Sequence, residues 1–321
     1  MVEKKELSHP AAFLGLIELI ELNKAGSPTD ANIFWIHLKP RELAELLDQE
    51  KSLKVSVGFV KRVLKDQGYK YRKQSKNLAT GKYGERDTQF EIIFKLVAMM
   101  SLNTPIISID CKKKENLGNL YRSGKLYTTD PLEVFDHDYQ SLSEGKVIPH
   151  GIFDLQLNEG YISIGNSSET AAFIKDNLLW WWDNYGIHNY PDAKTILILC
   201  DAGGGNSYRH HVFKKQLLYL AELTGIDFIV CHYPPYSSKW NPIEHRLFAH
   251  VHQAMQGVIF TDYNLVKELI GKTKTKTGLQ VFVRLNLGEY PTKIKTDKSE
   301  IDFSRIHFNQ QLPKLSYRIA A

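Results

Sequence analysis

The sequence predicts an α/β protein in which a mixed sheet flanked by helices follows a smaller all-α domain. Its 321 residues suggest roughly two domains, at about 150 residues per domain. Apolar residues at helical spacing dominate the first hundred residues, whereas β-branched runs begin near residue 105. From residue 195 these runs alternate with helical segments, which is typical of a mixed sheet covered on both faces.

The composition excludes several classes of protein. With 43% hydrophobic and 24% charged residues, the chain is neither disordered nor collagenous. The longest apolar-looking run, residues 11–22, contains Glu18 and Glu21 and is shorter than the roughly 20 residues that span a bilayer. No signal peptide is visible, and the three cysteines are too far apart for a disulfide framework or a zinc knuckle. We therefore expect a cytoplasmic, nucleoid-associated protein without a membrane partner.

The first 86 residues predict a helical domain. Apolar residues recur at helical spacing over 40–49 and again over 56–69, with Ser56 available as the N-cap of the second helix. Two helices joined by a tight turn indicate a helix-turn-helix, whose second helix enters a major groove. The polar residues that follow, 69–85, suit a wing or an arm, as in a winged-helix-like domain.

Positive charge is concentrated in this region. Between Lys51 and Lys82 there are ten basic residues and a single acid, Asp66, and tyrosines are interspersed among them. A basic surface with aromatic residues is the pattern expected for a phosphate-backbone partner; a solvated helix face is the alternative. The residues expected to bind DNA here are Lys61, Arg62, Lys65, Arg72 and Lys73.

Residues 87–257 predict the sheet domain, with polar residues of about 112–146 as an insertion. Strands are expected at 105–111, 148–157, 160–165, 195–201 and 226–234, and helices at about 87–102, 168–185, 208–223 and 241–256. Residues 258–321 are again basic, and we expect them to form a C-terminal appendage that faces substrate or another subunit.

Three acids occupy topologically matched positions. Asp110 ends the first strand, Asp201 ends the strand of residues 195–201, and Glu244 lies in the first turn of the last helix. In this topology we expect the two strands to be neighbours in the sheet, so that the two aspartates emerge side by side. Converging carboxylates repel one another unless hard cations neutralise them. Two Mg²⁺ ions about 3.5–4 Å apart would do so and would support phosphodiester cleavage or transfer.

Each acid also has a purely structural interpretation. An Asp at a strand end commonly accepts hydrogen bonds from turn amides, and a Glu in the first helical turn favours the helix dipole. Asp154, Asp136 and Asp138 are reserve candidates. Lys239 and Arg246, which flank the Glu244 turn, are expected to contact phosphate. The turn DAGGGN has neither GxGxxG nor GK[ST], which argues against nucleotide binding.

Several segments resemble a known family. IISIDCKKKENLGN, IPHGIFDLQLNEGYISIG, ILCDAGGGNSYR and VCHYPPYSSKWNPIEHRLFAHV, followed by KTKTKTGLQV, are similar to the ISAzo-type insertion-sequence transposases, or Rhodopirellula transposase family. The resemblance covers about residues 35–315. The shorter PPYS and NPIE elements also resemble the wider Tc/mariner group of DDE transposases.

The resemblance implies a ribonuclease-H-like catalytic domain whose triad of two Asp and one Glu binds two Mg²⁺ ions, with Mn²⁺ able to substitute. The triad would fall on Asp110, Asp201 and Glu244. Family members cut double-stranded DNA at terminal inverted repeats and join the freed 3′-hydroxyl to target DNA, and a homodimer on paired ends is expected by analogy. The segment ahead of Pro40 is shorter than in other members, which suggests a shortened copy.

The sequence therefore predicts a DNA transposase. The alternative from a different class is a DNA-binding regulator or a domesticated, catalytically silent transposase that keeps the triad as a relic. A structure-specific nuclease, which would cleave without joining, is a third interpretation.

Overall fold

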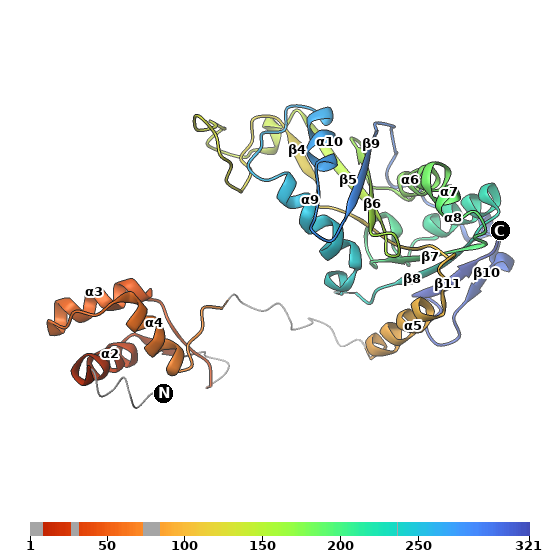
Figure 1. The fold of residues 1–321 in the computed structure, drawn as a ribbon. Coiled ribbons are helices and arrows are strands. Elements are labelled where there is room, and N and C mark those ends of the chain that lie inside the picture. Colours follow the sequence, from red (N-terminus) through yellow and green to blue (C-terminus); the bar gives the residue numbers. More distant parts are fainter. Residues whose placement is uncertain (1–8, 27–31, 73–83, 236) are drawn as a thin grey trace. The chain divides into compact units, whose positions relative to one another are not determined.

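The structure, a computed structural model, describes residues 9–26, 32–72, 84–235 and 237–321. The chain divides into two compact units, residues 1–78 and 79–321 (Figure 1). Within the described ranges, no helix combines the length and apolarity needed to cross a bilayer.

In the residues that the structure describes, the N-terminal unit has three helices and a small sheet. The helices are α2 (Pro10–Leu22), α3 (Pro40–Lys51) and α4 (Val57–Asp66). Strands β1 (Lys24–Gly26) and β2 (Phe34–Ile36) pair antiparallel, so the predicted all-α domain is corrected to a mixed one. The sequence of β2, Phe-Trp-Ile, is aromatic and β-branched and so favours extended backbone, but three residues are too few to show a period.

One apolar face of each helix builds the core of this unit. Leu16 of α2, Leu43 and Leu47 of α3, and Val60 of α4 are buried together. The hydroxyl of Ser56 accepts a hydrogen bond of 3.1 Å from the backbone N–H of Phe59, which caps α4 as the sequence predicts. The opposite face of α4 therefore points to solvent.

The larger unit is built on a nine-stranded mixed sheet. Its strand order is β10-β11-β8-β7-β3-β5-β6-β9, with β4 pairing β5 outside this path. The pairs β3–β7, β7–β8 and β6–β9 are parallel, and the other pairs are antiparallel. In chain order the strands are β3 (Ile106–Cys111), β4 (Glu115–Leu117), β5 (Gly145–Asp154), β6 (Glu159–Gly165), β7 (Thr195–Cys200), β8 (Asp227–His232), β9 (Gln280–Asn286), β10 (Ile306–Phe308) and β11 (Ser316–Ile319).

Helices cover both faces of this sheet, as the sequence predicts. One face packs against α6 (Ala171–Trp181) and α8 (His211–Thr224), and the other against α5 (Arg86–Met99), the π-helical turn η5 (Glu244–Phe248) and α9 (Ala249–Ala254). The remaining segments are η1 (Gln140–Leu142), η2 (Trp182–Gly186), α7 (Ile187–Asn189), η3 (Gly204–Asn206), η4 (Ser238–Trp240), α10 (Tyr263–Gly271), η6 (Lys298–Glu300) and η7 (Phe303–Arg305).

Residues 258–321, which the sequence predicts as an appendage, extend the sheet at both edges. β9 pairs with β6, and β11 pairs with β8, which puts strands from the C-terminal part of the chain at opposite sides of the same sheet. The alternating apolar residues of β9, such as Val281 and Val283, carry the period-two signal of a strand, but the surrounding lysines obscure it.

Two glycines let η5 lie close on the sheet. A Cβ atom placed at Gly151 of β5 would lie 2.6 Å from the Cε1 atom of Phe248 and 2.9 Å from the Cδ1 atom of Ile243. Leu247 fills the equivalent space at Gly160 of β6. The segment that carries Glu244 therefore packs on the central strands at a distance that only glycine permits.

We expect Gly151→Ala to lower the free energy of unfolding by about 1–3 kcal/mol, because the added methyl group overpacks the contact with Phe248. Urea unfolding of the full chain measures it. Gly271→Ala is the control, since the nearest atom there is Val283 Cγ2 at 4.0 Å, and it should stay within about 0.5 kcal/mol. Equal effects of the two variants would contradict close packing of η5.

Candidate active site

The parallel pairing of β3 with β7 brings two aspartates to one edge of the sheet. Ile109 is opposite Cys200 in the register, so the residues that follow, Asp110 and Asp201, leave neighbouring strands at the same level. This confirms the adjacency of the two strands that the sequence predicts. Oδ1 of Asp110 accepts a hydrogen bond from the N–H of Cys111 at 2.7 Å, and Oδ1 of Asp201 accepts one from the N–H of Gly203 at 3.2 Å.

Glu244 reaches this edge from the helical side. It is the first residue of η5, and its N–H donates to the carbonyl of Asn241 at 3.1 Å. Ile243 and Leu247, on either side of it, are fully buried against the sheet. Glu244 is therefore half-buried above the face of β3 from which Asp110 projects.

The three carboxyl groups act on one another electrostatically. Burial raises the pKa of Asp110 to about 8, and the negative charges of Asp201 and Glu244 contribute to the shift. Burial also raises the pKa of Glu244, again with a contribution from Asp201, whereas the neighbouring His245 acts in the opposite direction. The site therefore holds more negative charge than its own surroundings compensate.

The donor chemistry of these acids fits a hard divalent cation. Carboxylate oxygens are the ligands that Mg²⁺ and Ca²⁺ prefer, and the raised pKa of Asp110 means that a nearby positive charge would stabilise its ionised form. In the part of the chain that the structure describes, however, no three His, Cys, Asp or Glu side chains are already arranged as a set of metal ligands. The acids converge, but their side chains would have to turn toward a common ion.

A fourth acid, Glu169, belongs to the same group and is missing from the sequence prediction. It lies just ahead of Thr170, the N-cap of α6, and its Oε1 atom accepts a hydrogen bond from the N–H of Gly205 at 3.5 Å. Burial raises its pKa, with a contribution from Asp201, and its charge adds to the raised pKa of Asp110. In the sequence alone, an acid at this position is indistinguishable from a favourable helix start.

The glycine-rich turn after Asp201 packs against the start of α6. Gly204 has φ of +61°, a conformation that favours glycine. A Cβ atom at Gly205 would lie 2.9 Å from the carbonyl carbon of Thr170. The glycines therefore serve a turn that needs a positive φ at Gly204 and a close contact of Gly205 with the start of α6.

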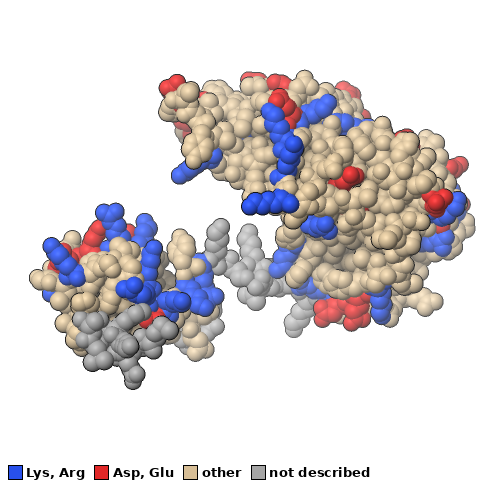
Figure 2. Space-filling model, viewed as in Figure 1, with Lys and Arg blue, Asp and Glu red and all other residues tan. Residues whose placement is uncertain are grey.

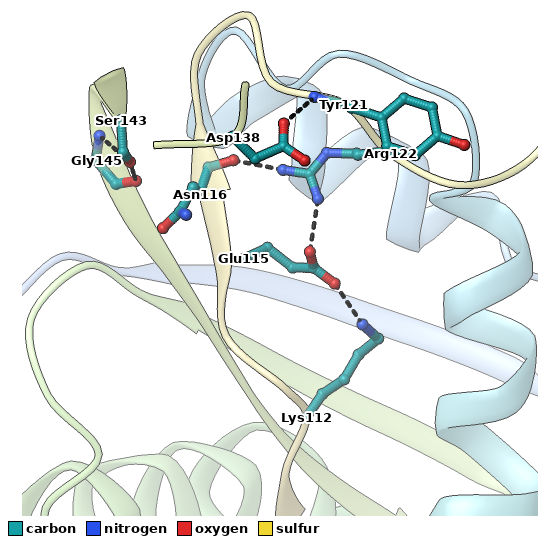
Figure 3. A network of polar contacts seen from close by, with 8 residues as sticks. All are labelled: Lys112, Glu115, Asn116, Tyr121, Arg122, Asp138, Ser143 and Gly145. Atoms are coloured by element: carbon teal, nitrogen blue, oxygen red, sulfur yellow. Dashed lines mark hydrogen bonds and ion pairs between the residues drawn. The ribbon is translucent and has the colours of Figure 1, made fainter. Parts of the chain in front are cut away.

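Behind Asp110, a chain of ion pairs ties the insertion to the site. The buried ammonium of Lys112 donates to Glu115 at 2.9 Å, and Glu115 also accepts from Arg122 at 2.6 Å (Figure 3). Burial would raise the pKa of Glu115, but Lys112 and Arg122 outweigh it and lower the pKa. The guanidinium of Arg122 also lies 3.4 Å from the ring centroid of Phe260. The base of the insertion is thus fixed to the body of the unit.

The reserve acids have structural partners. Asp154 is fully buried and accepts hydrogen bonds from the hydroxyl of Tyr190 at 2.9 and 3.0 Å. Asp138 accepts one from the N–H of Tyr121 at 2.9 Å (Figure 3). Asp136 lies 3.2 Å from the ring nitrogen of His137 and is 92% exposed. Among these acids, none contributes to the raised pKa values of Asp110 and Glu244.

The basic residues predicted to bind DNA lie on both units. Lys61, Arg62, Lys65 and Arg72 are exposed, and Figure 2 shows Lys and Arg side chains of the N-terminal unit reaching into solvent. Lys73 lies outside the described residues. On the larger unit, Lys239 and Arg246 are exposed on either side of Glu244. The ammonium of Lys239 lies 5.5 Å from the ring centroid of Trp240, and Arg246 donates to the side chain of Asn158 at 3.2 Å.

Comparison with known proteins gives a family match. The profile of a family described as the Rhodopirellula transposase DDE domain matches residues 15–321. Among solved structures, a Mos1 transposase paired-end complex with the left transposon end shares 17% identity over 80% of this chain and 68% of that chain, with a TM-score of 0.45. A pre-cleavage Mos1 transpososome shares 16% identity over 80% and 69%, with a TM-score of 0.46. No curated protein sequence matches significantly.

The raised pKa of Asp110 predicts a stability effect in the metal-free protein. The native-state pKa of about 8 lies above the ordinary value of 3.8, so the protonated form favours folding. That contribution is complete below about pH 4 and is lost as the pH rises through about 8. Asp110→Asn, which stays neutral, should remove about 1–2 kcal/mol of desolvation and repulsion at high pH. This corresponds to a rise in Tm of about 2–8 °C.

Thermal unfolding in EDTA from pH 4 to pH 9 measures this difference. The gain of Asp110→Asn over wild type should grow from near zero at pH 4 to its full size above pH 8. Asp136→Asn, at an exposed acid, should show no such trend. A constant or falling gain for Asp110→Asn would mean that this carboxyl group is not held at a raised pKa.

Proposed function

The chain belongs to the family of Rhodopirellula transposase DDE domains, and from that premise we propose that it is a DNA transposase that cleaves element ends and joins them to target DNA. The observation that carries the proposal is the meeting of three acids at one place. Asp110 and Asp201 end adjacent parallel strands, and the charges of Asp201 and Glu244 act on Asp110. In a chain of this family, such a group suits phosphodiester chemistry.

Asp110, Asp201 and Glu244 would hold two Mg²⁺ ions, for which Mn²⁺ can substitute. When bound, the ions supply Lewis-acid activation of the attacking oxygen and charge stabilisation of the leaving oxygen. The three side chains would hold the ions in place, because two of them come from strand ends and the third comes from the start of η5, which packs on the sheet. Water attacks first and cuts a strand, and the freed 3′-hydroxyl then attacks target DNA.

The sheet supports assignment to a ribonuclease-H-like catalytic domain. Three antiparallel strands, β6, β5 and β3, are followed by the parallel strands β7 and β8, with the Asp-bearing strands in the middle. Lys239 and Arg246, exposed beside Glu244, would neutralise phosphates of the strand being cut.

The N-terminal unit would recognise the terminal inverted repeats as a helix-turn-helix. Helices α3 and α4 are joined by residues 52–56, and Lys61, Arg62 and Lys65 lie on the solvent side of α4. A helix with this charge fits a major groove lined by phosphates. Because transposition joins two ends, we propose a homodimer on paired ends that acts at the nucleoid.

We expect Asp110→Ala, Asp201→Ala and Glu244→Ala each to abolish Mg²⁺-dependent nicking of DNA that carries the element ends, because each removes ligand oxygen and compensating charge. A gel assay with Mg²⁺, Mn²⁺ or EDTA measures product, and strand-transfer products distinguish a transposase from a nuclease. DNA binding should be retained. Asp136→Asn, at the exposed reserve acid, should cleave like wild type.

Two results would contradict this assignment. Normal cleavage by any of the three alanine variants would remove that residue from the site. DNA binding by the wild-type protein without cleavage under any metal condition would favour the catalytically silent DNA-binding protein.

We expect Lys61→Gln, Arg62→Gln and Lys65→Gln to weaken binding to all DNA sequences, because each removes one positive charge that neutralises a phosphate. The slope of log affinity against log salt concentration should become shallower by about 0.9 for each phosphate that is no longer neutralised. Fluorescence anisotropy between low and moderate salt measures the slope. Lys215→Gln is the control, since Lys215 on α8 is paired with Glu300 at 2.5 Å. An unchanged slope in a variant that carries all three substitutions would exclude α4 as the DNA-binding helix.

A further inference from the structure

A buried polar pair joins β3 to the segment that carries Glu244. The hydroxyl of Ser108 donates to Oδ1 of Asn241 at 2.5 Å, and Nδ2 of Asn241 donates to the carbonyl of Ile109 at 3.2 Å. The backbone N–H of Ile243 donates to the Ser108 hydroxyl at 3.1 Å. Ser108 and Asn241 are both fully buried. These three bonds connect one strand to two residues of the turn before η5.

The surroundings of this pair are apolar. On that face of the sheet Ser108 lies between Phe153 of β5 and Leu199 of β7 in the strand register, and Ile243 packs beside it, all of them buried. A polar group in such a place must find its partner within the protein, because burial without a hydrogen bond is costly. Ser108 uses its hydroxyl as both donor and acceptor, and Asn241 uses both ends of its amide. A shift of the turn along β3 would break all three bonds together.

The pair also lies next to two of the three acids. Side chains two residues apart on a strand share a face, so Ser108 projects from β3 on the same side as Asp110. Asn241 precedes Glu244 by one helical turn, and the N–H of Glu244 donates to the Asn241 carbonyl at 3.1 Å. The hydrogen bonds between Ser108 and Asn241 therefore fix the position of Glu244 relative to Asp110.

We propose that Ser108 and Asn241 are positioning residues, which lock the start of η5 onto β3 and thereby hold Glu244 where it can share a divalent cation with Asp110. The consequence for metal binding rests on the proposed function. The attachment of η5 to β3 does not depend on the proposed function, and it can be measured in the metal-free protein. Neither side chain needs to touch metal or DNA.

The test uses the full-length protein with Ser108→Ala, Asn241→Ala and both changes combined. Ser108→Thr is the conservative variant, because it keeps the hydroxyl on a strand that tolerates a β-branched residue. Leu220→Ala in α8 is the stability control, since it empties a buried position on the opposite face of the sheet. Two quantities are measured: backbone amide hydrogen exchange in EDTA, and Mn²⁺ affinity from the electron paramagnetic resonance signal of the free ion.

Ser108→Ala and Asn241→Ala should each raise amide exchange over residues 243–248 and weaken Mn²⁺ binding by about 10–100-fold, the range seen when partners behind metal ligands are removed. The double variant should lose little more affinity than either single one, because the two residues act as one unit. Ser108→Thr should restore both readouts toward wild type. Leu220→Ala should lower Tm without changing Mn²⁺ affinity.

The two proposals fail in distinguishable ways. If wild type binds Mn²⁺ and Ser108→Ala binds it equally well with unchanged exchange at 243–248, the positioning role is wrong and the transposase proposal stands. If wild type binds no Mn²⁺, the metal-dependent function is wrong. In that case the exchange data alone decide the locking: increased exchange confined to 243–248 supports it, and unchanged exchange overturns it.

Discussion

The parallel hydrogen bonding of β3 to β7 is the constraint on which the site depends. It places Ile109 opposite Cys200, and a slip by one residue would turn Asp110 to the other face of the sheet. The register is protected from both sides, because Ile107 and Ile198 are buried in the core under α6 and α8, while Ser108 is bonded to the opposite helical layer. The position of the acids thus depends on packing against both faces of β3, one under α6 and α8 and the other under η5.

The site stores unfavourable electrostatic energy that the rest of the unit must offset. The four acids at this partly buried edge interact with one another: Asp110, Asp201, Glu169 and Glu244. Burial and the neighbouring negative charges destabilise the ionised form of Asp110, which raises its pKa to about 8. Folding such a group is possible because the sheet and its two helical layers bury a large apolar core. Lys112, a buried cation just beyond β3, is paired with Glu115 and also lowers the pKa of Glu244, but burial still keeps that pKa raised.

How far the sequence predicts this arrangement depends on whether each signal is local. Asp110 and Asp201 each follow an apolar run, and Glu244 follows Pro242 at a helix start. The sequence alone therefore predicts where these two strands end and where this helix begins. Strand β9, short β11 and the β1–β2 hairpin are missed, because they are defined by partners far along the chain and basic or short sequences conceal them. Glu169 and the Ser108–Asn241 pair are missed for the same reason: their neighbours are fixed by tertiary packing alone.

The backbone partners of the acids explain why no ligand group of three is already set among the described residues. Oδ1 of Asp110 accepts from the N–H of Cys111, and Oδ1 of Asp201 accepts from the N–H of Gly203, so one oxygen of each carboxylate is already used by a backbone amide. A cation must displace the proton that Asp110 carries below about pH 8 and compete with those amides. Because η5 is pressed onto Gly151 and bonded to Ser108, the helix has little room to approach. The adjustment that closes the site must therefore come from rotation of the three side chains on a fixed backbone.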